Sequence, residues 1–217
     1  MPVSLSMNAS IAAFRSAMNG TRGPVLQARA SLAFGSSTAV RISMPLAFVI
    51  AHPVEHRETI LRLNVEYLDW VREGIVRMFG SHALTSFHTS VQEDASATLE
   101  KLCRADAPEG VFYLLELQDQ PVGMCALRRL HGDVAEFKRV YIRQAFRGMG
   151  LGRVVLQRLL SDARALGCRT VCLDTAEFMH AARRLYLAHG FVDCLPHGDV
   201  EVPRAFHHRW HFMQRSV

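Results

Sequence analysis

Apolar residues recur at helical spacing in two stretches of the first half of the chain. The stretch from His56 to Phe79 carries apolar residues three and four positions apart, and Gly80 follows it as a stop signal. A shorter patch from about Glu93 to Arg104 repeats the spacing. The pattern predicts a long helix and a short helix, separated by a loop.

Compact apolar runs on either side of these helices predict strands. PLAFVIA, which directly follows Met44, is the first. The runs Val111–Leu117 and Pro121–Leu130 are separated only by the turn-like Gln-Asp-Gln, so we expect them to form a hairpin. Another turn then leads into a strand-prone segment ending at Ile142.

A glycine-rich turn separates this segment from the next apolar periodic stretch, which continues to about Leu166 and ends at Gly167. The second half then predicts a strand at Thr170–Thr175, a helix at Phe178–Ala188, and strands beginning at Phe191 and within HHRWHFMQR. This order of helices and strands predicts an α/β or α+β fold with a sheet of mixed pairing.

The turn from Arg147 to Arg153 has the chemistry of an anion site. The first amide groups of a helix have no partner within the helix, and the helix dipole places partial positive charge there. Glycines allow the backbone to approach a phosphate closely, and arginines add charge. The Walker pattern is absent, and the glycine spacing is not G-x-G-x-x-G. The pattern present is R-x-x-G-x-G, formed by Arg147, Gly150 and Gly152.

This loop resembles the pyrophosphate loop of the GNAT superfamily of acyl-CoA N-acyltransferases. Two longer stretches share the likeness. AEFKRVYIRQAFRGMGLGR is similar to the central strand and loop of a bacterial subgroup, and LDTAEFMHAARRLYLAHGF is similar to the segment that follows. The order of elements agrees with that fold from about Pro45 to Gln214. The C-terminal VPRAFHHRWHF follows no pattern of the subgroup, which leaves the acceptor pocket undefined.

The resemblance implies a mixed, mostly antiparallel twisted sheet flanked by helices, with a splayed pair of parallel central strands. The pantetheine arm of acetyl-CoA would lie in the splayed gap, against backbone groups of the strand that precedes the loop. The residues implied in cofactor binding are Val140, Tyr141, Ile142, Arg147, Gly148, Met149, Gly150, Leu151, Gly152 and Arg153.

The resemblance also implies two catalytic residues. Tyr186 would protonate the departing thiolate, since a tyrosine with a pKa near ~10 stays protonated at neutral pH; the alternative is a core tyrosine whose hydroxyl caps a carbonyl. Glu136 would assist deprotonation of the amine; the alternative is that it pairs with Lys138 on the same strand face. The expected function is transfer of an acetyl group from acetyl-CoA to a primary amine by direct attack in a ternary complex. A non-catalytic acyl-CoA sensor or interaction module is the alternative.

Composition narrows the remaining classes. The chain has 217 residues, 49% of them hydrophobic, which suits one sizeable core. Its five cysteines lack C-x-x-C spacing and indicate reduced thiols in a cytoplasmic compartment. No apolar run has the ~18–20 residues of a membrane span. We therefore expect no membrane partner. The resemblance to the acyltransferase family implies a small-molecule or peptide amine as acceptor, and a homodimer remains open.

The net charge of +5 comes largely from the N-terminal segment. No acidic residue precedes Glu55, whereas four arginines do. We expect residues 1–43 to form a disordered or targeting-like extension and residues 44–217 to form the acetyltransferase domain. Since a basic tail is not a basic binding face, no nucleic-acid partner is expected.

We expect structural roles for two further groups of polar residues. Asp174 ends a strand and Thr175 follows it, and together they are expected to cap the helix that begins near Phe178. The C-terminal histidines lack accompanying carboxylates or cysteines at ligand spacing, so no metal is expected. If that segment is a strand, His207 and His211 share one face and His208 lies on the other.

Overall fold

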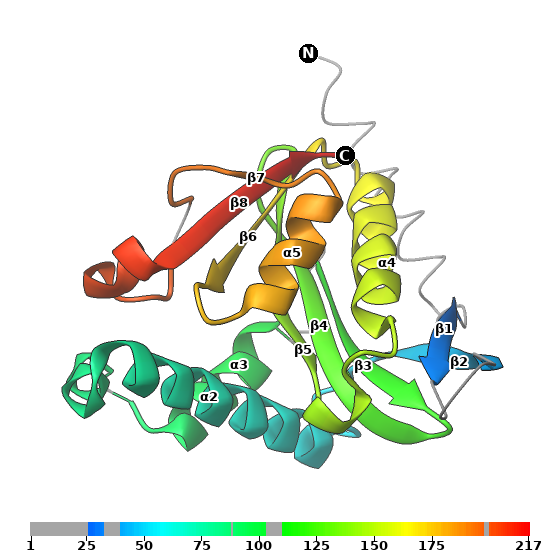
Figure 1. Cartoon of the computed structure of the whole chain (residues 1–217), viewed down its shortest axis with the longest axis horizontal. Coiled ribbons are helices and arrows are strands. Elements are labelled where there is room, and N and C mark those ends of the chain that lie inside the picture. The colour runs from blue at the N-terminus through cyan, green and yellow to red at the C-terminus, as the bar shows by residue number, and fades with distance from the viewer. Residues whose placement is uncertain (1–25, 33–39, 88, 103–109, 198–199) are drawn as a thin grey trace.

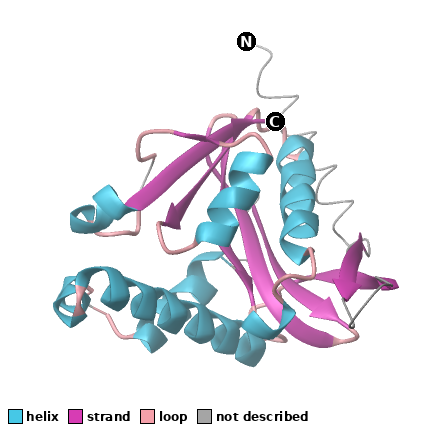
Figure 2. Ribbon diagram, viewed as in Figure 1, coloured by secondary structure: helices cyan, strands magenta, loops and turns pink. Residues whose placement is uncertain are grey.

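The computed structural model describes residues 26–32, 40–87, 89–102, 110–197 and 200–217, and these form one sheet with helices on both faces (Figures 1 and 2). The strands are β1 Leu26–Leu32, β2 Val40–Ile50, β3 Gly110–Leu117, β4 Gln120–His131, β5 Val134–Ile142, β6 Thr170–Ala176, β7 Val192–Asp193 and β8 Trp210–Ser216. The helices are α2 Arg57–Phe79, α3 Val91–Leu102, α4 Leu151–Ala165 and α5 His180–Ala188. Short 3-10 turns are η1 Ser81–Ser86, η2 Gln144–Phe146 and η3 Arg204–Arg209.

The eight strands follow the order β1-β2-β3-β4-β5-β6-β8-β7. Every neighbouring pair is antiparallel except β5 and β6. That parallel pairing is short, because its last matched residues are Glu136 and Cys172, whereas β5 continues to Ile142 and β6 to Ala176. The two central strands therefore diverge, which confirms the expected mixed sheet with a splayed parallel pair.

A backbone irregularity lies in the divergent part of β5. Arg139 has a φ of 53°, in a region that non-glycine residues seldom adopt. The register between β4 and β5 shifts at the same level, between Met124 and Ala126. A bulge of this kind bends a strand and redirects the side chains that follow it.

The two faces of the sheet are covered by different helices. One core cluster joins Ala135 and Phe137 of β5 to the apolar side of α4 and to Tyr186 of α5. The other joins Tyr141, beyond the bulge, to Ile60 of α2 and its neighbours. Successive side chains of a strand point to opposite faces, so the polar side chains of Glu136 and Lys138 point away from the face that carries Ala135 and Phe137.

Most predicted elements are confirmed. The hairpin is formed by β3 and β4, and α4 is followed by Gly167 with a φ of 77°, as expected for a helix stop. The helix α5 begins two residues later than expected, at His180. Phe178 instead packs on α2, where a Cβ added to Gly74 would lie 2.3 Å from its ring.

The expected C-terminal strand is shorter than predicted. Residues 204–209 form η3, and β8 begins only at Trp210. The ring of Phe206 packs between those of Phe79 and Phe87, with centroid distances of 4.8 and 5.9 Å, which holds this segment in a turn against α2 and η1. The prediction that His207, His208 and His211 alternate along one strand is therefore wrong.

The N-terminal boundary also differs from the expectation. β2 begins at Val40 and pairs with β1, which lies within the segment expected to be an extension. The sheet therefore reaches back beyond residue 44. Residues 1–25 and 33–39 lie outside the described residues, and the expectation for them stays a prediction.

Candidate active site

The N-terminus of α4 presents a row of unpartnered amides. Gly148 and Gly150 have φ values of 80° and 77°, which glycine adopts without strain, and Gly150 is the N-cap residue. The amide of Arg153 donates to the Gly150 carbonyl at 3.1 Å. None of the five amides of residues 148–152 donates to another residue that the structure describes. With the helix dipole, these amides form a site for an anion.

The two arginines beside this loop lie differently. The Nε of Arg147 donates to the Ile142 carbonyl at 2.9 Å, and its guanidinium stacks over the rings of Trp70 and Tyr141 at 4.6 and 5.8 Å. Arg153 is exposed on the first turn of α4. Arg147 therefore connects the loop to the aromatic residues of α2, and a phosphate role for either arginine stays a prediction.

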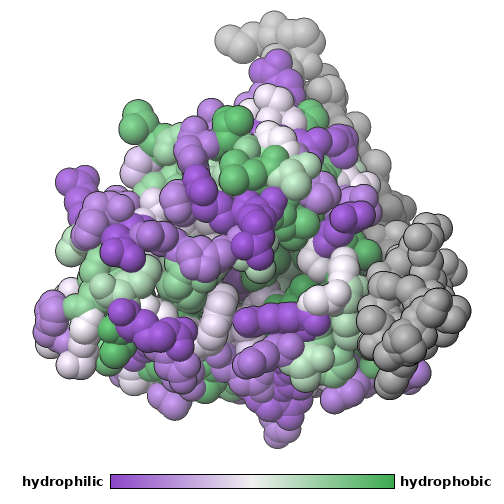
Figure 3. All heavy atoms as spheres, in the orientation of Figure 1, coloured by the Kyte–Doolittle hydropathy of each residue, from purple (hydrophilic) through white to green (hydrophobic). Residues whose placement is uncertain are grey.

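A cavity of about 650 Å³ opens where β5 and β6 diverge. Its walls come from α2, α3, β5, β6, α5 and the segment around η3. The space-filling view shows the surface hollowed near its centre, with hydrophilic side chains around much of the hollow (Figure 3). Apolar and aromatic side chains form most of the walls: Tyr67, Leu68, Trp70, Val71, Phe87, Phe137, Val140, Leu173, Met179, Ala182, Tyr186, Val202, Pro203 and Trp210.

Tyr186 contributes to both the core and the cavity. It is 5% exposed on α5, its ring lies 5.7 Å from that of Phe191, and it lines the cavity. Burial raises the pKa of its hydroxyl well above the usual value, so the group is protonated at neutral pH. No hydrogen bond joins this hydroxyl to another described residue, so the alternative of a hydroxyl capping a carbonyl is not observed there.

Glu136 lies in a buried ion-pair cluster. Its side chain is 3% exposed; Arg128 Nε donates to it at 2.7 Å, while Lys138 Nζ and His197 Nε2 lie at 3.4 and 3.7 Å. Burial acts to raise the pKa of this carboxyl, but His197 and the charges of Lys138 and Arg128 outweigh burial and lower the pKa to about 2. Glu136 does not line the cavity. The alternative to a catalytic base, pairing with Lys138, is therefore observed.

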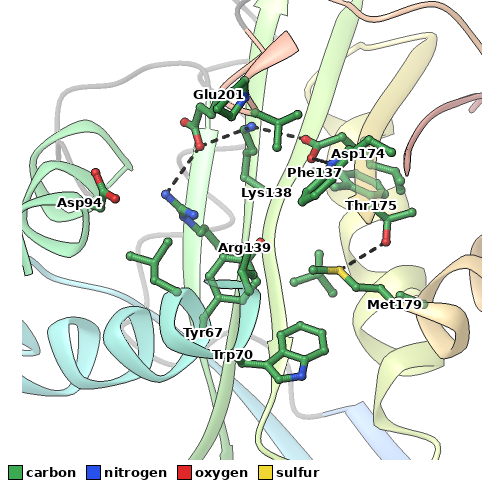
Figure 4. Close-up of a pocket in the computed structure, with 18 of the residues that line it drawn as sticks. Tyr67, Trp70, Asp94, Phe137, Lys138, Arg139, Asp174, Thr175, Met179 and Glu201 are labelled. Atoms are coloured by element: carbon green, nitrogen blue, oxygen red, sulfur yellow. Dashed lines mark hydrogen bonds and ion pairs between the residues drawn. The ribbon is translucent and has the colours of Figure 1, made fainter. Parts of the chain in front are cut away.

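Lys138 connects this cluster to the cavity, where Figure 4 shows it between Asp174 and Glu201. Besides Glu136, its Nζ lies 3.6 Å from Asp174 and 3.7 Å from Glu201. Burial alone would lower the pKa of this ammonium, but the charges of Asp174, Glu201 and Glu136 outweigh burial and raise the pKa above its usual value. The lysine therefore stays charged and holds three carboxylates of three separate segments together.

Asp174 does not cap α5. Its Oδ2 accepts a hydrogen bond from the Trp210 indole at 2.8 Å, and α5 has Met179 as N-cap residue without a side-chain cap. The Thr175 hydroxyl instead lies 3.5 Å from the Met179 sulfur. The capping prediction is wrong, because β8 brings an indole donor to this strand end.

Sequence reasoning missed the aromatic residues of α2 as part of this site. Tyr67 and Trp70 each pack against Tyr141, with centroid distances of 5.8 and 6.2 Å, and both line the cavity. Their spacing of three residues marked only one side of an amphipathic helix. Their position beside the divergent strands follows from tertiary packing, which the spacing does not encode.

The described part of the chain lacks two other kinds of functional feature. No group of three or more His, Cys, Asp or Glu side chains converges there as a metal-ligand set. Among the described helices, none has both the length and the apolar character needed to span a bilayer.

Diverging central parallel strands beside a helix N-terminus with free amides define an acyl-CoA N-acyltransferase fold. Residues 77–191, more than half of the chain, match the model of the Acetyltransferase (GNAT) family. The chain belongs to the GNAT family of acyl-CoA N-acyltransferases, as the sequence patterns predicted.

Relatives of known name agree with this assignment. The uncharacterized N-acetyltransferase YjgM of Escherichia coli is 28% identical over 118 residues, which span 50% of this chain and 71% of YjgM. An IAA acetyltransferase of Azospirillum brasilense is 34% identical over 67 residues, 31% of this chain, and the match covers only 44% of that relative. The structure of the PaiA N-acetyltransferase of Thermoplasma acidophilum in complex with coenzyme A superposes with a TM-score of 0.61 at 17% identity, over 80% of this chain and 100% of PaiA.

Proposed function

We propose that the protein transfers an acetyl group from acetyl-CoA to a primary amine of a small molecule, amino acid or peptide. The transfer occurs by direct attack in a ternary complex. The observation that carries this proposal is the divergence of β5 and β6 beside the unpartnered amides of residues 148–152, with Tyr186 lining the same cavity. An anion site, a strand-like slot and a proton donor are the three parts that thioester aminolysis requires.

In this proposal the amides of residues 148–152 bind the diphosphate of the acyl donor. Positive φ values at Gly148 and Gly150 support this role, since they keep the loop free of side chains where the diphosphate approaches. Backbone groups of Val140, Tyr141 and Ile142 pair with the amides of the pantetheine arm, because their side of β5 has lost β6 as a partner. The PaiA structure, a complex with coenzyme A, supports such binding for this fold.

The chemistry uses a backbone amide and one side chain. An amide near Val140 and Tyr141 stabilises the developing oxyanion as the amine attacks the thioester carbon. Tyr186 donates its proton to the departing sulfur. A buried, protonated hydroxyl without a described partner suits this step, because the proton is present at neutral pH and is not engaged elsewhere.

Glu136 has a positioning role in this proposal. A carboxylate with a pKa of about 2, paired with Arg128 and Lys138, is a weak proton acceptor and a strong anchor for cations. It fixes the Arg128 and Lys138 side chains, which both line the cavity. We therefore assign Glu136 to the organisation of the cavity wall and do not assign it to proton transfer.

Two measurements on the full chain test the proposal. Calorimetry with coenzyme A and acetyl-CoA should give saturable binding, and thiol release from acetyl-CoA should depend on an added primary amine from a panel of amino acids, polyamines and arylalkylamines. Tyr186→Phe should retain binding and lose turnover. Binding without turnover on any amine, unchanged in Tyr186→Phe, would favour the sensor; absence of binding at millimolar coenzyme A would refute both readings.

A further inference from the structure

The structure describes three carboxylates that line the cavity: Asp94, Asp174 and Glu201. Asp94 is engaged by Arg72 at 2.9 Å. Glu201 is 49% exposed and lies 3.7 Å from Lys138 and 3.6 Å from Arg139. Asp174 is 22% exposed. It is the one of the three that belongs to a central strand, on the part of β6 that has already diverged from β5.

The position of Asp174 is fixed from both sides. Trp210 of β8 donates to Oδ2 at 2.8 Å, and Lys138 Nζ of β5 lies 3.6 Å from Oδ1 (Figure 4). A distance of 3.6 Å exceeds that of a charge-assisted hydrogen bond, which is near ~2.8 Å. Oδ1 therefore has an ion-pair neighbour but keeps hydrogen-bonding capacity toward the cavity.

Three further ionisable groups whose pKa depends on Asp174 lie on α2, α5 and β6. Tyr67 of α2 and Tyr186 of α5 both respond to its charge: burial is the main cause that raises the pKa of each hydroxyl, and Asp174 adds to it. The pKa of Cys172 on β6 is raised by burial, then by Glu136 and Cys194, with a smaller contribution from Asp174. Asp174 therefore acts electrostatically on Tyr186, the proposed proton donor. Lys138 lies between Glu136 and Asp174.

We propose that Asp174 is the carboxylate that binds the acceptor's ammonium group and removes its proton. This inference rests on the proposed function and names the class of acceptor, an amine that arrives protonated. One proton passes from the ammonium to Asp174 and on to solvent, and the nitrogen lone pair forms the C–N bond. As the C–S bond breaks, sulfur takes the Tyr186 proton, and the second proton released from nitrogen restores that hydroxyl.

Asp174→Asn separates this role from a structural one. The amide oxygen of asparagine can still accept the Trp210 hydrogen bond, so the variant removes charge and basicity while it retains the contact. Glu201→Gln is the matched control, because it also removes a cavity carboxylate beside Lys138. Asp174→Ser is a second neutral variant, which offers the Trp210 indole a hydroxyl acceptor. It is used if Asp174→Asn proves thermally unstable.

The experiment compares two aromatic acceptors of similar size, benzylamine, which is protonated at pH 7.5, and benzhydrazide, which is already neutral. We expect Asp174→Asn to lower kcat/KM for benzylamine by about 10²-fold or more, the usual contribution of a positioned base, and for benzhydrazide by less than about 10-fold. Glu201→Gln should change both by less than about 3-fold.

A loss of equal size on both acceptors, or no loss on either, would overturn the role of Asp174 while acetyl transfer itself stood. If the wild-type protein bound coenzyme A but acetylated neither probe nor any amine of the panel, the proposed function would fail first. The two failures are therefore distinguishable.

Discussion

The substitution Gly148→Asp tests the anion site at α4 directly. A Cβ at this position meets no atom within 4 Å, so a small side chain has room. The φ of 80° costs some strain, but Asp and Asn tolerate this region better than most residues. Gly148→Asn therefore carries the same size and nearly the same strain without the charge. The difference between the two variants isolates electrostatic repulsion of a bound diphosphate.

The magnitude follows from Coulomb's law. Two unit charges ~6 Å apart repel by ~0.7 kcal/mol in water and by ~2.8 kcal/mol at an effective dielectric constant of ~20. A diphosphate presents about two charges to an exposed loop that salt partly screens, so we expect a loss of about 1.5–3 kcal/mol. That loss corresponds to coenzyme A binding about 10- to 150-fold more weakly in Gly148→Asp than in Gly148→Asn.

Calorimetry with coenzyme A at two salt concentrations measures this difference. Gly167→Asp is the control, because Gly167 has a φ of 77°, meets no atom within 4 Å of its Cβ, and lies at the opposite end of α4. The gap between the Asp and Asn variants should narrow as salt is raised. Equal affinities for all three variants would refute the reasoning that this loop binds the diphosphate.

Three further predictions concern catalysis and stability. Tyr186→Phe should lower kcat, measured by thiol release, by about 10²-fold, and should leave the Kd of coenzyme A, measured by calorimetry, within about 2-fold. An unchanged kcat would argue against the acid role. Glu136→Gln should lower the free energy of unfolding by about 3 kcal/mol at pH 7. Because the folded pKa of Glu136, about 2, lies below the ordinary 4.5, its contribution is present above pH 4.5 and is lost as the pH falls toward 2; urea titrations at pH 7 and pH 3.5 should show the deficit shrink. Gly74→Ala should cost about 1–3 kcal/mol, measured by urea unfolding, and less in a Phe178→Leu background, because the added Cβ would lie 2.3 Å from that ring; equal losses in both backgrounds would exclude the clash.

Elements with strong local patterns could be predicted from the sequence. The long helix α2 has a sustained apolar periodicity, and its stop at Gly80 is observed. The β3–β4 hairpin combines two apolar runs with a short turn. The free amides of the glycine loop before α4 were predictable because unpaired amides at a helix start follow from backbone geometry alone.

Features that depend on distant partners could not be predicted in this way. The strand β1 packs at a sheet edge and has no strong apolar run, so only its pairing with β2 defines it. Asp174 was expected to cap a nearby helix, but its partners Trp210 and Lys138 come from strands far away in the sequence. Glu136 was expected to be a catalytic base, with pairing to its strand neighbour Lys138 as the alternative, and that pairing is observed. Its pairing with Arg128, which lies across from it on β4, could not be predicted from local sequence.

Because β5 and β6 pair only as far as Glu136 and Cys172, the sheet opens in its middle beyond these residues. Beyond that point the peptide N–H and C=O groups on the facing edges of β5 and β6 do not hydrogen-bond to each other, whereas the other neighbouring strands of the sheet are paired. A ligand that fills the slot would act as an additional strand between two parts of the sheet, β1 to β5 on one side and β6, β8 and β7 on the other. Ligand binding should therefore raise the free energy of unfolding, by ~2.7 kcal/mol when the ligand is present at ~100 times its Kd.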